Sequence, residues 1–120
     1  VEEILQTQSL DKIFEAVSLA LSVEDEEDRD LILFDTIKWL VKNGIWQKAY
    51  GTAQMMSDSY EKSEAFQIIA NHLVSIGHLE KAFSVFAEAE KAAVSENLSE
   101  WQQAELLHKV AAAHFQIKAV

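Results

Sequence analysis

The chain has 120 residues, with 20 acidic against 10 basic side chains, no Cys, no Pro and only 3 Gly. This length suits one domain, and the missing cysteines exclude disulfide bonds and thiolate zinc sites. The net charge of -10 repels the phosphates of nucleic acids and of anionic membrane surfaces, so neither is expected as a partner.

Six helices are predicted, because apolar residues recur at helical spacing along most of the chain. In chain order they cover residues 9–22, 28–43, 45–57, 60–76, 79–94 and 99–118. Residues 1–8 are interpreted as a frayed start, with Ser9 as the cap of the first helix. Gly44 and Gly77 fall where two helices should end, since glycine readily adopts the left-handed backbone that closes a helix.

Two helix starts carry a capping pattern. Ser99 with Gln102 forms a capping box, and Asp58 with Glu61 resembles one. The links between the predicted helices are short, so consecutive helices must turn back and pack antiparallel. The longest link is expected around residues 94–99.

The sequence repeats itself at a step of 33 residues. Residues 40–50 fall on residues 73–83, and five of these eleven positions are identical. The same step relates apolar and small positions of an earlier copy to this one, Ile13, Ala16 and Ala20 corresponding to Trp46, Ala49 and Ala53. A further partial copy follows at a step of 41, because the longer link intervenes.

Glycine, a large apolar residue two positions later and alanine three further on recur as Gly44-Trp46-Ala49 and Gly77-Leu79-Ala82. This pattern, within residues 9–118, resembles the tetratricopeptide repeat, a helix–turn–helix unit of about 34 residues. The resemblance implies an all-α fold in which antiparallel helical hairpins stack into a right-handed superhelix. The step of 33 and the missing closing proline depart from the family pattern.

We therefore expect one tetratricopeptide-like domain over residues 1–120. It would consist of half a hairpin at 9–22, hairpins at 28–57 and 60–94, and a terminal helix at 99–118. The first residue is Val1 rather than Met, so a fragment of a longer array stays an open alternative. No apolar stretch approaches the roughly 20 residues of a membrane span, and no signal peptide is visible, so a cytoplasmic location is expected.

No pattern in the sequence supports catalysis. It lacks Cys, a glycine-rich phosphate loop and a Gly-x-Ser-x-Gly motif. His72 and His78, like His108 and His114, are six residues apart rather than at the i,i+4 spacing that places two ligands on one helix face. We expect no enzyme activity, no catalytic residue, no metal and no cofactor.

Glu105 and His108 keep an alternative open. Their i,i+3 spacing is half of the motif found in di-iron helical bundles, which need a second such pair and two more glutamates. A helical metal-dependent enzyme that uses these two residues is therefore a further hypothesis.

Residues 24–30 hold the strongest concentration of charge, six carboxylates and one arginine. They precede the apolar stretch that begins at Leu31, where carboxylates stabilise a helix N-terminus by about 0.3–1 kcal/mol each. Helix capping and a solvated surface are the favoured interpretation of this run. A docking strip for a basic partner stays open.

The three tryptophans, Trp39, Trp46 and Trp101, are interpreted as core residues, and His114 as a half-buried helix histidine. The last helix carries an apolar stripe at helical spacing, made of Trp101, Leu107, Val110 and Phe115. If this stripe is exposed, the chain could associate with itself through the terminal helix.

The resemblance also implies a partner site, because the concave face of such stacks is lined mainly by the first helix of each hairpin. The family's groove positions fall on Phe34, Lys38, Val41, Glu64, Gln67, Asn71, Val74, His108 and Phe115. This mixture of apolar, amide and charged side chains suits an extended or helical peptide. The basic clamp by which some family members hold a C-terminal carboxylate is missing.

The expected function is a non-catalytic protein–protein interaction module that binds a peptide or a protein surface through this concave face. The partner is expected to be a protein or peptide, without nucleic acid and without membrane insertion. One alternative is a small acidic chaperone of the secretion type, which holds an amphipathic helix of its client. The other is the metal-dependent enzyme with Glu105 and His108.

Overall fold

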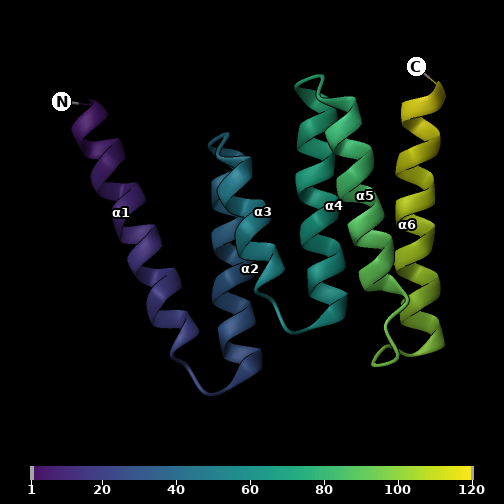
Figure 1. Cartoon of the computed structure of the whole chain (residues 1–120), viewed down its shortest axis with the longest axis horizontal. Helices are drawn as coiled ribbons and strands as arrows, with labels where there is room; N and C mark the ends of the chain where they lie inside the picture. The colour runs from purple at the N-terminus through teal and green to yellow at the C-terminus, as the bar shows by residue number, and fades with distance from the viewer. Residues whose placement is uncertain (1, 120) are drawn as a thin grey trace.

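A computed structural model of the chain describes residues 2–119, with side chains described from Ser9 to Ile117. This part of the chain is all-helical, as predicted, with six α-helices and no strand (Figure 1). The helices are α1 (Glu2–Leu21), α2 (Glu26–Lys42), α3 (Trp46–Gln54), α4 (Ser59–Ser75), α5 (Leu79–Ala93) and α6 (Glu100–Ala119).

The predicted boundaries agree with these helices to within a few residues, except at the start of α1. The helix begins at Glu2, so the frayed start predicted for residues 1–8 and the cap at Ser9 are both wrong within the described residues. Residues 2–8 are mostly Glu, Gln and Leu, which favour helix even without a clear apolar stripe. Residue 1 lies outside the described residues.

The two glycine positions close their helices as predicted. Gly44 and Gly77 have φ angles of 79° and 85°, in the left-handed region. After Gly77, the His78 N–H donates to the Leu73 carbonyl at 2.9 Å, while the Gly77 N–H donates to the Val74 carbonyl at 3.1 Å. This pair of bonds is the Schellman closure, and the same pattern follows Gly44. Each closure lets the chain reverse within about two residues.

Side-chain caps mark the starts of three helices. The Asp25 carboxylate accepts from the Asp28 N–H at 3.0 Å at the start of α2, and Asp58 accepts from the Glu61 N–H at 2.8 Å at the start of α4. Before α6, Ser99 and Gln102 exchange two such bonds, the reciprocal capping box that the sequence predicts.

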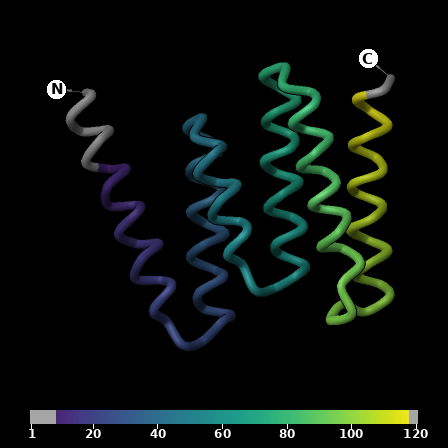
Figure 2. Tube along the Cα trace, viewed as in Figure 1, coloured from purple at the N-terminus to yellow at the C-terminus, as the bar shows by residue number. Residues whose placement is uncertain are grey.

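The helices follow one another along the longest axis of the molecule, and each packs against the next (Figure 1). In addition α2 packs against α4, and α4 against α6. Odd-numbered and even-numbered helices run in opposite directions (Figure 2). The Cα extents are 43 × 37 × 15 Å. The shortest extent corresponds to two helices across, because packed helix axes lie about 8–10 Å apart.

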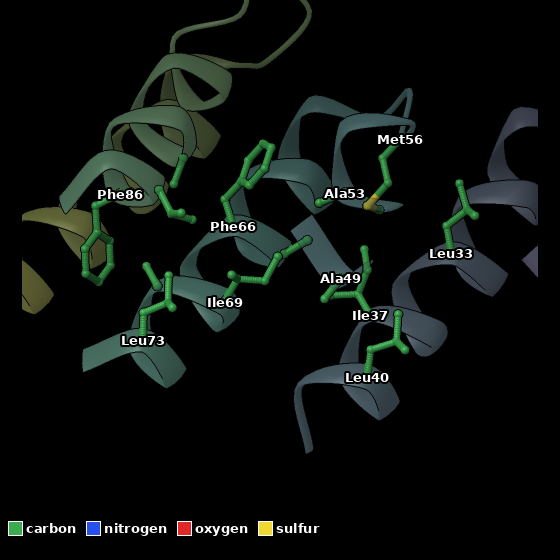
Figure 3. Packing of buried hydrophobic residues seen from close by; sticks show 14 of the residues in the cluster. Leu33, Ile37, Leu40, Ala49, Ala53, Met56, Phe66, Ile69, Leu73 and Phe86 are labelled. Atoms are coloured by element: carbon green, nitrogen blue, oxygen red, sulfur yellow. The ribbon is translucent and has the colours of Figure 1, made fainter. Parts of the chain in front are cut away.

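The core lies between these helices and reproduces the repeat. Equivalent positions in successive hairpins are fully or almost fully buried in one continuous cluster, including Leu33 with Phe66, Leu40 with Leu73 and Ala53 with Phe86 (Figure 3). Alanine at 49 and 82 lets the second helix of each hairpin approach the first closely.

Trp39 and Trp46 are half-buried against this cluster, as predicted. Trp101 is 72% exposed, so the core interpretation is wrong for this residue. The predicted apolar stripe of the last helix is also only partly exposed, since Val110 is buried and Leu107 packs against Leu98 and Ala93. Both differences arise because α6 packs through Leu106 and Val110 against α4 and α5, which leaves Trp101 on the outer side.

Candidate functional site

The side-by-side packing of α2, α4 and α6 brings equivalent positions of three helices onto one surface. We call this surface the α2–α4–α6 face. Its side chains are exposed or half-buried and form rows across the helices at the steps of 33 and 41 residues. The rows are Asp35, Ile68 and Lys109; Lys38, Asn71 and Ala112; and Lys42, Ser75 and Gln116.

The residues predicted to line the groove divide into three groups. Lys38, Asn71, His108 and Phe115 are exposed; Phe34, Val41, Glu64 and Val74 are half-buried; and Gln67 is buried. The Gln67 amide donates to the Ser63 hydroxyl at 3.3 Å, and Ser63 donates to the Ala89 carbonyl of α5 at 2.8 Å. Gln67 is thus part of the contact between α4 and α5, and its side chain is withdrawn from the open surface.

The open surface includes Lys38 and Asn71 of the predicted set and extends beyond them on each helix. Asp35, Ile68 and Lys109 belong to it, although the sequence reasoning did not select them. The 3-4-3 spacing correctly keeps residues on one helix face, but it does not say toward which neighbour that face turns. A comparison of all equivalent positions across the copies would have identified these rows as the non-core ones.

At the α2 end of the face, Lys38 lies over the Phe34 ring at 5.0 Å from its centroid and 3.3 Å from the Asp35 carboxylate. Both charged side chains are largely exposed, so the ion pair contributes little to stability. Lys38 therefore remains able to exchange this contact for one with a ligand.

At the α6 end, four polar side chains join α4 to α6, and we call them the Tyr60 cluster. The Tyr60 hydroxyl donates to the Glu105 carboxylate at 2.9 Å. The Lys109 ammonium lies 3.3 Å from Glu64 and 3.2 Å from Glu105, and 5.9 Å from the centroid of the Tyr60 ring. One lysine thus neutralises two carboxylates that the packing of the helices brings together.

The pKa values in the Tyr60 cluster follow from this arrangement. Burial raises the pKa of Tyr60, as do its hydrogen bond to Glu105 and the nearby Glu64 charge. Burial alone would lower the pKa of Lys109, but its hydrogen bonds to Glu105 and Glu64 outweigh burial and raise the pKa. The lysine stays protonated at neutral pH and is held by α4 and α6.

The metal hypothesis rests on Glu105 and His108, and the structure gives these residues different surroundings. Glu105 is half-buried and turned toward Tyr60 and Lys109, whereas His108 is exposed. Among the residues that the structure describes, no three His, Asp or Glu side chains gather in an arrangement suited to a metal ion.

His114 is half-buried, as predicted. Its ring packs edge-on against Phe86 and Phe83, with centroids 4.8 Å and 5.6 Å away. This contact fixes α6 on α5 and leaves the imidazole in a structural environment.

An acidic hollow of about 380 Å³ lies where the N-termini of α2 and α4 meet the loop before α6. Its lining includes Glu26, Glu27, Asp30, Asp58, Glu61 and Asn97. Burial, followed by the charges of Asp58 and Asp30, raises the pKa of Glu61.

Two carboxylates of residues 24–30 accept bonds from backbone N–H groups, Asp25 as the cap of α2 and Asp30 from the link between α3 and α4. Asp30 is only 1% exposed, and its carboxylate accepts from the backbone N–H groups of Ser57 and Asp58. The adjacent Arg29 donates to the Ser57 hydroxyl at 2.7 Å. The run thereby connects the start of α2 to the start of α4. Asp25 agrees with the capping interpretation, whereas Asp30 departs from it because it is buried and bonds to another segment.

Comparison of the chain with protein-family models, with curated proteins and with solved structures gave no match. Among residues 2–119, every helix is too short or too polar to cross a membrane.

Proposed function

We propose that the chain is a tetratricopeptide-like, non-catalytic interaction module whose hairpins form a right-handed superhelix. Its ligand is a segment of a partner protein, bound along the α2–α4–α6 face. The repeat at 33 residues and the pairwise packing of α2 with α4 and of α4 with α6 support this proposal.

The observation that carries the proposal is the composition of the face. Its middle row presents an ammonium at Lys38, an amide at Asn71 and a small apolar side chain at Ala112. Ile68 adds a half-buried apolar contact beside Asn71. A few polar groups that fix orientation, set among apolar contacts, suit an extended or helical peptide better than a small molecule.

The chemistry of the face restricts the ligand further. Lys109 is already shared between Glu64 and Glu105, so it is not available to hold a terminal carboxylate. Lys38 is exposed, and its contacts are the weak ion pair with Asp35 and the face of the Phe34 ring, both within α2. We therefore expect an internal segment that carries an acidic side chain near Lys38.

A test begins with a random peptide library displayed on phage and selected against the chain. Selected peptides are titrated into the ¹⁵N-labelled protein, and we expect amide shifts to concentrate on α2, α4 and α6. Lys38→Glu should lower the affinity by about tenfold, which corresponds to ~1.4 kcal/mol. Asn71→Ala should also lower the affinity for the peptide, because the side-chain amide that orients the peptide is lost.

Lys91→Glu is the matched control, since Lys91 is an exposed lysine on α5 and the charge change is the same. It should leave the affinity unchanged. Shifts confined to α3 and α5, or equal effects of the Lys38 and Lys91 substitutions, would contradict the proposed site.

A further inference from the structure

The charge of the α2–α4–α6 face changes sign along its helices. Two more rows continue the face toward the N-terminal ends of α2, α4 and α6, and their side chains are also exposed or half-buried. These rows are Asp28, Glu61 and Gln102; and Leu31, Glu64 and Glu105. From this end to the other, the five rows carry net charges of -2, -2, 0, +1 and +1. The face is thus acidic at one end and basic at the other.

The charged side chains at both ends are open to a ligand. Lys42 and Asp28 are exposed, and neither forms an ion pair with another described side chain. Lys38 makes its contacts within α2, and a ligand carboxylate can replace them. Glu61 also lines the acidic hollow, so a cation beside it meets further carboxylates. The basic end therefore suits carboxylates, and the acidic end suits cations.

Between its two ends the face is more apolar. Leu31 is 54% exposed, and Ile68 and Ala112 present apolar side chains in the next two rows. The two carboxylates in the row of Leu31 already share the Lys109 ammonium. A ligand that matches the face therefore needs opposite charges at its two ends and apolar side chains between them.

The dimensions of the face fit a helix. Asp28 and Lys38 are ten residues apart in α2, which corresponds to about 15 Å at a rise of 1.5 Å per residue. In a ligand helix, a spacing of about 11 residues spans a similar distance and returns to the same side after three turns. A helix also satisfies its own backbone N–H and C=O groups, whereas an extended segment needs partners for them on the face.

The direction of the ligand follows from the directions of the protein helices. α2, α4 and α6 run parallel, and the basic rows lie toward their C-terminal ends (Figure 2). A ligand helix that begins at this end is antiparallel to all three, so the helix dipoles attract one another. Carboxylates in its first turns also stabilise the ligand helix itself. Both effects favour the same direction.

We propose that the ligand of this face is an amphipathic helix with carboxylates in its N-terminal half and lysine or arginine in its C-terminal half. The helix lies antiparallel to α2 and α4, with its carboxylates beside Lys38 and Lys42 and its cations beside Asp28 and Glu61. This ligand class rests on the proposed function, since both use the α2–α4–α6 face.

Two synthetic peptides of about five helical turns, or roughly 18 residues, test the proposal on the parent chain. The first has glutamates in its N-terminal half, lysines in its C-terminal half and apolar residues between them on one side. The second has the same composition with glutamates and lysines exchanged. A hydrocarbon staple on the outward side keeps both peptides helical, which circular dichroism verifies.

Fluorescence anisotropy measures the affinity of each peptide. At low salt the first peptide should bind about tenfold more tightly, because the exchange replaces attraction by like-charge contacts at both ends of the second. High salt should reduce this difference, since the charges are close to solvent.

Exchanging charges on the protein should change the preference. In the double variant Lys42→Glu with Asp28→Lys, one attractive and one repulsive contact remain at each end, so the two peptides should bind about equally. Lys91→Glu with Glu90→Lys is the matched control, because it exchanges the same charges at exposed positions of α5. This control should keep the preference of the parent chain. Circular dichroism must show that both variants are folded.

A nitroxide label at the N-terminus of the first peptide reports its direction. It should broaden the backbone amide signals around Lys42 and Ser75 and spare those around Asp28 and Ser59. The opposite pattern indicates a parallel helix and overturns the proposal.

Failure of the ligand class is distinguishable from failure of the proposed function. If the second peptide binds as tightly as the first, while amide shifts stay on α2, α4 and α6, the ligand class is wrong and the interaction face stands. The same conclusion holds if neither peptide binds but phage-selected peptides do bind this face. Shifts confined to α3 and α5 contradict both proposals.

Discussion

Replacing Asp30 with alanine is expected to destabilise the fold by about 3 kcal/mol, because this side chain joins two hairpins. Asp30 lies in α2 and is 1% exposed. Both of its carboxylate oxygens lie 3.1 Å from the Ser57 backbone nitrogen, and one lies 2.7 Å from the Asp58 nitrogen. Alanine leaves both N–H groups without this acceptor.

The magnitude follows from these two donors. A hydrogen bond to a charged group contributes roughly 1.5–3 kcal/mol, so two of them set a range of about 3–6 kcal/mol. The acidic hollow adjoins Asp30 and allows water to reach the freed N–H groups, which places the loss at the lower end. At an m-value of about 1.5 kcal/mol/M in urea, a loss of 3 kcal/mol lowers the midpoint by about 2 M.

Urea unfolding followed by circular dichroism measures this change. Asp28→Ala is the control, because Asp28 is an exposed carboxylate in the first turn of the same helix. It should cost only the helix-dipole contribution, about 0.3–1 kcal/mol. If the two variants unfold within about 0.5 kcal/mol of each other at equal m-values, Asp30 does not connect the hairpins in the way described.

Two further predictions concern single positions. Gly77→Ala should lower the free energy of unfolding by about 1 kcal/mol, because Gly77 has a φ of 85°. Gly51→Ala, at a helical position of α3 with open space around it, should raise the free energy of unfolding by about 0.5 kcal/mol. Equal effects of the two substitutions in thermal unfolding would contradict the special role of the positive φ at Gly77. Because the pKa of Glu61 is raised, the folded state holds its proton more tightly than the unfolded state, and stability falls as pH rises through that pKa. Glu61→Gln should therefore raise the melting temperature at pH 7, with the gain disappearing below the ordinary value of 4.5. A gain that is the same at all pH values would contradict a pKa raised by burial and, secondarily, by the neighbouring carboxylates.

Local features of the fold could be predicted from the sequence because each depends on a few neighbouring residues. Gly44 and Gly77 close helices since only glycine adopts a positive φ without strain. Ser99 and Gln102 form a capping box through bonds across three residues. The repeat predicted which positions are equivalent, and Leu40 and Leu73 are both fully buried.

The candidate site was only partly predictable, because exposure depends on what lies across from a side chain. Gln67 and Asn71 are four residues apart, so helical spacing places them on one face of α4. Gln67 is nevertheless buried, whereas Asn71 is exposed. Lys109 was not selected, although it is the cation that joins Glu64 and Glu105. Glu64 and Lys109 are 45 residues apart, and only the packing of α4 on α6 brings them together.

Composition alone excluded disulfide bonds, and the scarcity of Gly and Pro together with helical spacing predicted an all-helical fold. Helical spacing and glycine positions determined where the six helices turn, since these depend on backbone geometry and local hydrogen bonds. Tertiary structure decided the rest. It buried Asp30 as an anchor rather than leaving it in a solvated acidic run, and it left Trp101 exposed rather than in the core. A residue's burial is set by the helix that packs against it, and that neighbour is chosen by contacts between distant segments.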